Sequence, residues 1–230
     1  MIELIENGGV TSAKGFLAGA TYAGIKMPED GVLDLAVLAS EIPAQTAGTF
    51  TTSKIVSPSV VLSRQRVENG IAHAVVVNSG CANCCVGEQG LQDADEMTSL
   101  AAKHIGLKTN KEVLVCSTGV IGVELPMALV RQNMSNIRLD RNGNNDFARA
   151  IMTTDSRPKQ VAVTVDVDGT KVTVGAAAKG VGMIHPNMAT MLCFITTDAM
   201  VENRFLNQIL KESVDSTFNM IDVDGDQSTN

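Results

Sequence analysis

The sequence has no tryptophan and one tyrosine, and aromatic residues make up only 3% of its 230 residues. Any core must therefore be built from aliphatic side chains, and 44% hydrophobic residues are enough to build one. No run reaches the roughly 18 apolar residues of a membrane-spanning helix, so we expect no membrane partner. Positive charge is not in excess either: the formal net charge is -7, which argues against nucleic acid as a partner.

The amino terminus lacks the basic and apolar regions of a secretory signal, so we expect a cytoplasmic protein. An odd number of cysteines, five, argues against a disulfide framework. Cys81, Cys84 and Cys85 have a spacing like that of a metal site, but structural zinc needs four ligands and no second Cys or His pair lies at a suitable spacing. We expect no metal here, and small apolar side chains packed in a turn.

The hydrophobic pattern predicts both strands and helices. The β-branched run over 72–78 predicts a buried strand that ends at Ser79-Gly80, and 111–119 predicts a second one. Apolar positions on one face predict a helix over 93–105, which Gly106 ends. Further elements are expected over 146–152 (a short helix), 191–197 (a strand) and 202–217 (an amphipathic helix).

The clearest local signal is a hairpin. Two alternating strands, 161–167 and 171–176, flank Asp168-Gly169, a dipeptide typical of tight hairpin turns. No repeat or linker interrupts the sequence, so we expect one continuous domain. The mixture of strands and helices with an antiparallel hairpin favours an α/β layered sandwich of mixed sheets and helices over a purely parallel sheet.

Two segments have the residue types of an active site. In 179–192, a lysine precedes a loop rich in glycine and proline, and a threonine, Thr190, stands where a strand begins. In 116–122, a strand ends at Thr118-Gly119, which presents a hydroxyl and an unhindered backbone N–H together, as an oxyanion site requires. Taken alone, the two segments are better read as a plain loop that enters a strand and an ordinary exit from a strand into a turn.

A resemblance over essentially the whole chain separates these interpretations. The matching segments, in order, are GVTSAKGFLAGATYAGIK (9–26), VVNSGCANCCVGEQG (76–90), STGVIGVELPM (117–127), IMTTDSRPK (151–159), KGVGMIHPNMATML (179–192) and VDGDQSTN (223–230). Together they resemble the ornithine acetyltransferase (glutamate N-acetyltransferase) family of arginine biosynthesis. The segment 179–192 resembles the self-cleavage motif of that family.

The resemblance implies a fold of the N-terminal-nucleophile type and a chain that cuts itself between Ala189 and Thr190. Residues 1–189 would form an α-chain-like segment, and 190–230 would begin a β-chain-like segment of the same domain. Cleavage would give Thr190 a free α-amine, which titrates near pH 7.7–8.0 and can act as the base for its own hydroxyl.

The implied reaction moves an acetyl group from N2-acetylornithine to glutamate through acetyl-Thr190, and bifunctional members also use acetyl-CoA. Thr118 and Gly119 would stabilise the oxyanion, while Thr153 and Lys179, with Thr190, would contact the substrate. No cofactor is implied. After cleavage the full-length protein would assemble as an αβ heterotetramer.

The chain departs from the expected pattern in two ways. Cys81 and Cys84 stand where the resemblance leads us to expect Asn and Ala. Family members also continue well beyond residue 230, so the implied site is incomplete within this chain. Two alternatives therefore stay open: a self-processing N-terminal-nucleophile aminopeptidase or amidase, and an inactive fragment.

Three other features are interpreted without catalysis. His104 lies on a predicted helix and is expected to be structural or solvated, and His185, in the cleavage loop, is not expected to be catalytic. The acidic run 222–226 hints at calcium, but Gln227 stands where an EF-hand loop needs glycine, so we reject that site.

Overall fold

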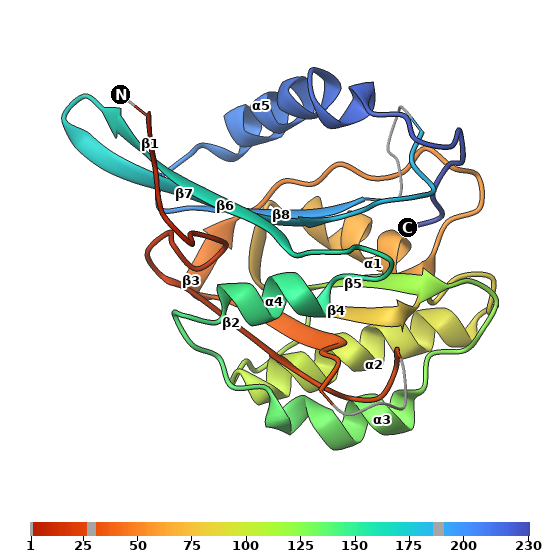
Figure 1. Cartoon of the computed structure of the whole chain (residues 1–230). Coiled ribbons are helices and arrows are strands. Elements are labelled where there is room, and N and C mark those ends of the chain that lie inside the picture. Colours follow the sequence, from red (N-terminus) through yellow and green to blue (C-terminus); the bar gives the residue numbers. More distant parts are fainter. Residues whose placement is uncertain (1, 27–30, 186–190) are drawn as a thin grey trace.

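The computed structural model describes residues 2–26, 31–185 and 191–230, which form a layered α/β sandwich. Figure 1 shows the layers in order: α5 on one side, a first sheet, a second sheet, and α2 with α3 on the opposite side. We call the first sheet, of order β1-β6-β7-β8, sheet A, and the second, of order β2-β3-β4-β5, sheet B. The predicted sandwich of mixed sheets and helices is confirmed.

Sheet B contains the first predicted strand, and the first predicted helix packs against this sheet. Its strands are β2 (Phe16–Thr21), β3 (Leu35–Gln45), β4 (Ile71–Cys81) and β5 (Val113–Val120). β4 and β5 are parallel, and α2 (Gln89–His104) forms the crossover between them. β-Branched and leucine side chains of this sheet pack against Met97 of α2, and α3 (Met127–Asn133) with the 3-10 turn Met134–Asn136 completes the layer.

Sheet A is antiparallel throughout and contains the predicted hairpin. Its strands are β1 (Ile2–Leu4), β6 (Lys159–Val167), β7 (Thr170–Lys179) and β8 (Leu192–Thr197). Asp168 and Gly169 both have positive φ, 50° and 80°, which a two-residue hairpin turn of this kind requires. Between the sheets lies α4 (Asn144–Ala150), where Phe147 meets Phe194 edge-to-face with ring centroids 5.1 Å apart.

The helix α1 (Pro58–Val67) was not predicted, and it lies along the edge strand β5. Ser63 Oγ donates to the carbonyl of Val115 at 2.6 Å and accepts from its N–H at 2.9 Å. Arg66 donates to the carbonyl of Val113 at 2.5 Å, and the hydroxyls of Ser59 and Ser117 are 2.8 Å apart. A polar stripe on α1 therefore satisfies the backbone at the free edge of sheet B.

The last helix, α5 (Asn203–Asp215), is amphipathic as predicted, with Phe205 56% exposed and Val214 buried. It is followed by a 3-10 turn, Phe218–Met220. The predicted boundaries needed small corrections: α2 begins at Gln89, four residues before 93, and α4 spans 144–150 instead of 146–152. In the described ranges, no helix has the length and apolarity needed to cross a membrane.

Candidate active site

Thr118 and Gly119 lie at the end of β5, where sheet B meets the loop after β4. Gly119 pairs with Gly80 of β4, and a Cβ placed on Gly119 would lie 2.3 Å from the carbonyl carbon of Gly80. The φ of Gly119 is also +134°, so glycine is required here for both reasons. Thr118 is buried and Gly119 is exposed.

Lys179, the last residue of β7, reaches from sheet A to sheet B. Its Nζ donates to Thr118 Oγ1 at 3.1 Å, although the two residues are 61 positions apart. Its side chain is buried at 4% exposure. Burial lowers the pKa of Lys179, Asp155 acts in the opposite direction, and the positive charges of Lys159 and Lys26 lower the pKa further. The ammonium therefore lies in a place that favours an incoming negative charge.

Asp155 connects Thr153 to this pair. Its carboxylate is almost fully buried and accepts hydrogen bonds from the N–H of Gly180 at 2.9 Å, from the N–H of Thr153 at 3.3 Å, and from Lys159 Nζ. Burial alone would raise the pKa of Asp155, but these bonds outweigh it and hold the pKa below its usual range. Lys179 therefore contacts Thr118, next to Gly119, and Asp155 links Thr153 to Gly180, next to Lys179.

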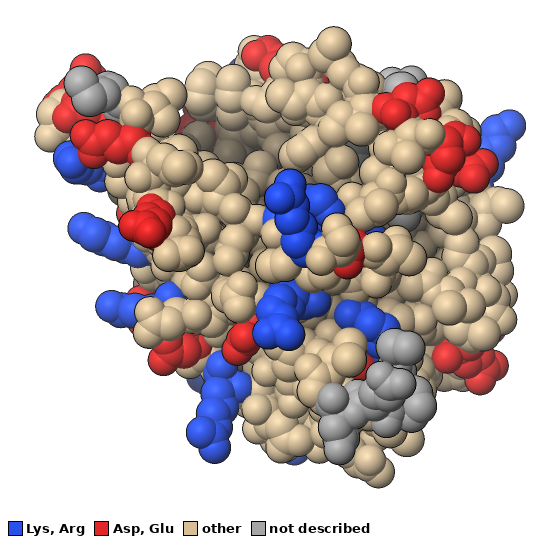
Figure 2. Space-filling model, in the orientation of Figure 1, with Lys and Arg blue, Asp and Glu red and all other residues tan. Residues whose placement is uncertain are grey.

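A third lysine, Lys26, borders the same region. Its Nζ donates to the carbonyl of Leu33 at 3.1 Å, and burial lowers its pKa while Asp34 and Asp155 raise it. Asp34 accepts three backbone N–H bonds, from Ala23, Ile25 and Lys26, at 2.7, 2.6 and 3.0 Å. In Figure 2, Lys and Arg side chains gather near the middle of the face shown, although the chain as a whole is acidic.

The carboxyl-terminal residues cover the end of β5. Asn230 Nδ2 donates to the carbonyls of Ala82 and Ser117 at 2.7 and 2.8 Å. A cavity of about 20 Å³ remains beside Thr118 and Gly119, enough for about one water molecule. Its lining residues are Ala82, Thr118, Gly119, Ile121, Met183, Ser228, Thr229 and Asn230.

The cleavage motif is described only in part. Ala189 and Thr190, the predicted cleavage pair, lie outside the described residues. Leu192, two positions after Thr190 in the sequence, pairs with Lys179 across β7 and β8. Earlier in the motif, the N–H groups of Met183 and Ile184 donate to Asp224 at 2.6 and 2.8 Å, and these bonds lower the pKa of Asp224. The acidic run 222–226 therefore holds the backbone of the motif at 183–184.

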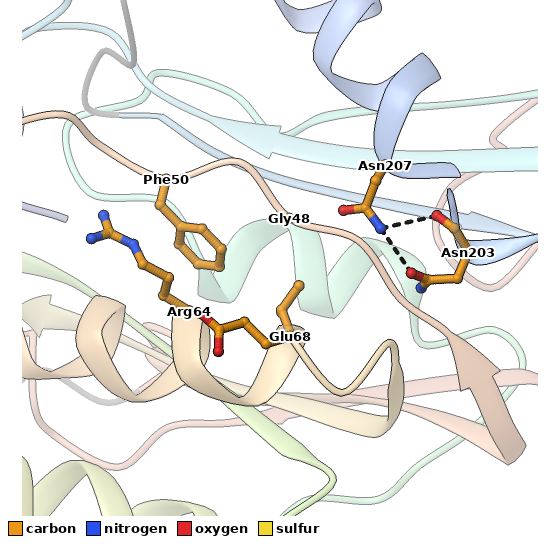
Figure 3. A pocket seen from close by; sticks show the side chains of 7 residues that line it. Gly48, Phe50, Arg64, Glu68, Asn203 and Asn207 are labelled. Carbon is orange, nitrogen blue, oxygen red and sulfur yellow. Dashed lines mark hydrogen bonds between the residues drawn. The ribbon is translucent and has the colours of Figure 1, made fainter. Parts of the chain in front are cut away.

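A larger hollow lies elsewhere and contains none of the predicted site residues. Figure 3 shows it between the end of α1, with Arg64 and the following Glu68, and the start of α5, which contributes Asn203 and Asn207. Its volume is about 340 Å³. Arg64 lies over the ring of Phe50, 5.6 Å from its centroid, and donates to the carbonyl of Thr51. The polar groups that converge around Thr118 lie outside this larger hollow.

The remaining sequence predictions concern histidine and cysteine. His104 is structural, as predicted, since its Nε2 lies 2.8 Å from the carbonyl oxygen of Ile137. Cys81, the last residue of β4, and Cys84, in the turn that follows, are buried, whereas Cys85 is exposed, so the predicted packing holds for two of the three. Across the part of the chain that the structure describes, no group of three or more His, Cys, Asp or Glu is placed to hold a metal.

Sequence reasoning missed Asp155, Lys26 and Lys159. A signal for them was present: Lys26 ends the first matching segment, and Asp155 and Lys159 both lie in IMTTDSRPK. Each belongs to a loop or strand end, where charged side chains in a matching segment more often serve a site than a core.

Comparison with known proteins gives matches over nearly the whole chain. The model of the ArgJ family matches residues 17–230. The arginine biosynthesis bifunctional protein ArgJ of Dehalococcoides mccartyi is 50% identical over 229 residues, which are 100% of this chain and 56% of the relative. That of Symbiobacterium thermophilum is 51% identical over 226 residues, 97% of this chain and 56% of the relative. The chain thus spans about half the length of the curated relatives it matches.

Solved structures also resemble this chain. The ornithine acetyltransferase of Mycobacterium tuberculosis, complexed with ornithine, is 35% identical with a TM-score of 0.75, covering 84% of this chain and 100% of that chain. The PH0078 protein of Pyrococcus horikoshii has a TM-score of 0.58 at 16% identity, covering 100% of this chain and 77% of that chain, and shows likeness of fold alone.

Proposed function

The chain belongs to the ArgJ family, and from that premise we propose that it is part of an acetyltransferase that moves an acetyl group from N2-acetylornithine to glutamate. The word bifunctional in the names of its relatives supports acetyl-CoA as a further donor. The ornithine bound to the Mycobacterium tuberculosis relative supports the substrate class. No cofactor takes part in the proposed reaction.

The observation that carries the proposal is the hydrogen bond from Lys179 to Thr118. The Thr118 oxygen accepts from the ammonium, so its own hydrogen is left to donate to an oxyanion, and a cationic partner makes that hydroxyl a stronger donor. The N–H of Gly119 supplies the second donor. Removing one such donor typically lowers turnover by about 100- to 1000-fold.

Thr190 is the proposed nucleophile. Its hydroxyl first attacks the Ala189 carbonyl, and the Ala189–Thr190 peptide bond is cut, which separates 1–189 from 190–230 within one domain. The new α-amine then takes the hydroxyl proton as Thr190 attacks acetylornithine. The Mycobacterium tuberculosis chain is matched in full by 84% of 230 residues, about 193, a length close to that of 1–189.

The charges around the site suit an amino-acid substrate. Lys26, Lys159 and Lys179 lie near two carboxylates, Asp34 and Asp155, so the site keeps an excess of positive charge. A substrate carboxylate beside Lys179 would restore charge balance, and Thr153, held by Asp155, would supply a hydroxyl next to it.

Two further statements complete the proposal. The full-length protein assembles as an αβ heterotetramer after cleavage. It works in the cytoplasm, where all five cysteines would stay reduced, in keeping with the five free thiols of the structure.

The test uses the full-length protein, wild type and Thr190→Ala, measured by intact mass under denaturing conditions. Wild type should give two chains separated between Ala189 and Thr190, and the variant one uncut chain. Acetylornithine is then supplied with and without glutamate. Formation of N-acetylglutamate supports the transferase, whereas free acetate at an equal rate without glutamate would indicate a hydrolase, and an uncut wild-type chain would refute the nucleophile.

A further inference from the structure

Two neighbouring thiols lie together in the loop between β4 and α2. The sulfur atoms of Cys84 and Cys85 are 3.8 Å apart. Cys84 is fully buried and Cys85 is exposed, so the pair has one sulfur at the surface and one directly beneath it. Cys84 also stands where the family resemblance leads us to expect alanine.

The backbone conformation brings the sulfurs together. In an extended chain, successive side chains point to opposite faces. Here Asn83 and Cys85 both have left-handed backbones, with φ of 49° and 60°, which bends the chain at the pair. The bend is fixed by other bonds: the N–H of Gly122 donates to the carbonyl of Cys84 at 2.9 Å, and Asn83 Nδ2 donates to the carbonyl of Gly90 at 2.8 Å.

The same geometry disfavours a direct disulfide and favours an atom that bridges the two sulfurs. An S–S bond is about 2.05 Å long and normally joins Cα atoms about 4.4–6.8 Å apart, whereas adjacent Cα atoms across a trans peptide are about 3.8 Å apart. Closing 3.8 Å to a bond would therefore strain this held loop. A soft, thiophilic centre that bonds to both sulfurs needs much less movement, and thiolates prefer such centres.

We propose that Cys84 and Cys85 form a dithiol site that binds a trivalent arsenical across both sulfur atoms. Cys85 reacts first because it is exposed, and the second bond closes onto Cys84. For a monosubstituted arsenical R–As=O, two As–S bonds form, the As=O bond breaks, and the oxygen leaves as water with both thiol protons. Arsenic stays trivalent throughout, so no oxidant or reductant is needed.

The site adjoins the proposed active site through the backbone. The carbonyl of Cys84 accepts a hydrogen bond from the N–H of Gly122, and the carbonyl of Val120 accepts one from the N–H of Ala82, both at 2.9 Å. The dithiol loop is therefore attached to the end of β5, just after Gly119. The side chain of Thr229, in the segment that covers this end, also forms a hydrogen bond with the Cys84 thiol. An arsenical at the pair therefore binds next to the oxyanion donors.

The experiment treats the reduced 230-residue chain with one equivalent of phenylarsine oxide in the presence of excess glutathione. Small ligands are then removed, and the thiols are counted in denaturant alongside intact mass. We expect one arsenical adduct and a fall from five thiols to three. Two bonds from one molecule hold about 100-fold or more tighter than one, so glutathione should not remove the adduct.

The matched variants are Cys84→Ala, which installs the residue expected from the resemblance, and Cys85→Ala. Each should keep all four remaining thiols and lose the adduct to glutathione. Cys193→Ala is the control, because burial raises the pKa of the Cys193 thiol to about 11 and keeps it unreactive, and it should still lose two thiols. The proposal is overturned if wild type keeps five thiols, or if Cys84→Ala retains the adduct as wild type does.

Discussion

Lys179→Met should make the chain more stable while it removes the proposed activity. The ammonium of Lys179 has three N–H donors, is 4% exposed, and donates to Thr118; within the described residues, no carboxylate lies at salt-bridge distance from it. A charge kept in such a place lowers stability, and replacing buried charges by apolar groups of similar size often stabilises by about 1–4 kcal/mol. The lost bond to Thr118 subtracts about 1 kcal/mol.

The net gain is therefore about 2 kcal/mol, which for a chain of this size raises Tm by roughly 4–8 °C. The pH dependence follows from the lowered pKa of Lys179. Above the folded-state pKa and below the unfolded value near 10.4, the unfolded state binds more protons, so wild-type stability rises with pH. The advantage of the Met variant should thus be largest at low pH and shrink as pH rises toward about 10.4.

Calorimetry of wild type and Lys179→Met at several pH values measures both effects. The control is Lys171→Met on the same strand, whose side chain is 69% exposed and 3.3 Å from Glu3, a pair worth less than about 1 kcal/mol. A Lys179→Met variant that melts below wild type at every pH would show that the ammonium is stabilised in place, and the argument for a site that awaits an anion would fail.

Three more predictions follow from the same contacts. Thr118→Ala in the full-length protein should lower kcat for acetyl transfer by about 100- to 1000-fold with little change in the acetylornithine KM; equal losses in both would point to a binding role. Asp155→Asn should cost about 2–4 kcal/mol in urea unfolding at pH 7, because the buried carboxylate accepts two backbone N–H bonds, while the exposed Asp166→Asn should stay within about 0.5 kcal/mol. Since the pKa of Asp155 is lowered by folding, its contribution is present above the unfolded value near 3.9 and is lost as pH falls through the folded pKa, so the two curves should converge in acid. Ser63→Ala should cost about 1–3 kcal/mol, since Val115 loses a partner for both its N–H and its carbonyl, and a loss below about 0.5 kcal/mol would mean that water replaces the hydroxyl.

Local signals predicted the elements that depend on local physics. The β-branched run over 72–78 is the centre of β4, and Asp168-Gly169 turns the hairpin, because side-chain alternation and positive φ are properties of the sequence itself. α1 was missed because its buried residues include serines and an arginine, so no apolar stripe marks it. Its burial is only explained by the edge strand it covers, which lies about 50 residues later in the chain.

The candidate site also has residues that the sequence predicts and contacts that only the fold creates. Thr118-Gly119 and Lys179 were found because each stands in a segment that resembles a family motif. That they touch is a property of the two stacked sheets, since β5 and β7 belong to different sheets and pair with different strands. Asp155 was missed because an aspartate in a polar loop is usually solvated, whereas this one is buried and accepts from the N–H of Gly180, which is 25 residues away.

The polar stripe of α1 also decides what β5 can do to other molecules. An exposed edge strand offers its backbone to any extended segment and so invites aggregation. Ser63 and Arg66 occupy those positions at Val115 and Val113, and Asn230 occupies the one at Ser117. The helix therefore prevents strand pairing between copies of the chain, and it also supports the strand that contains Thr118. Substitutions that loosen α1 should first cause concentration-dependent association through β5, before the fold is lost.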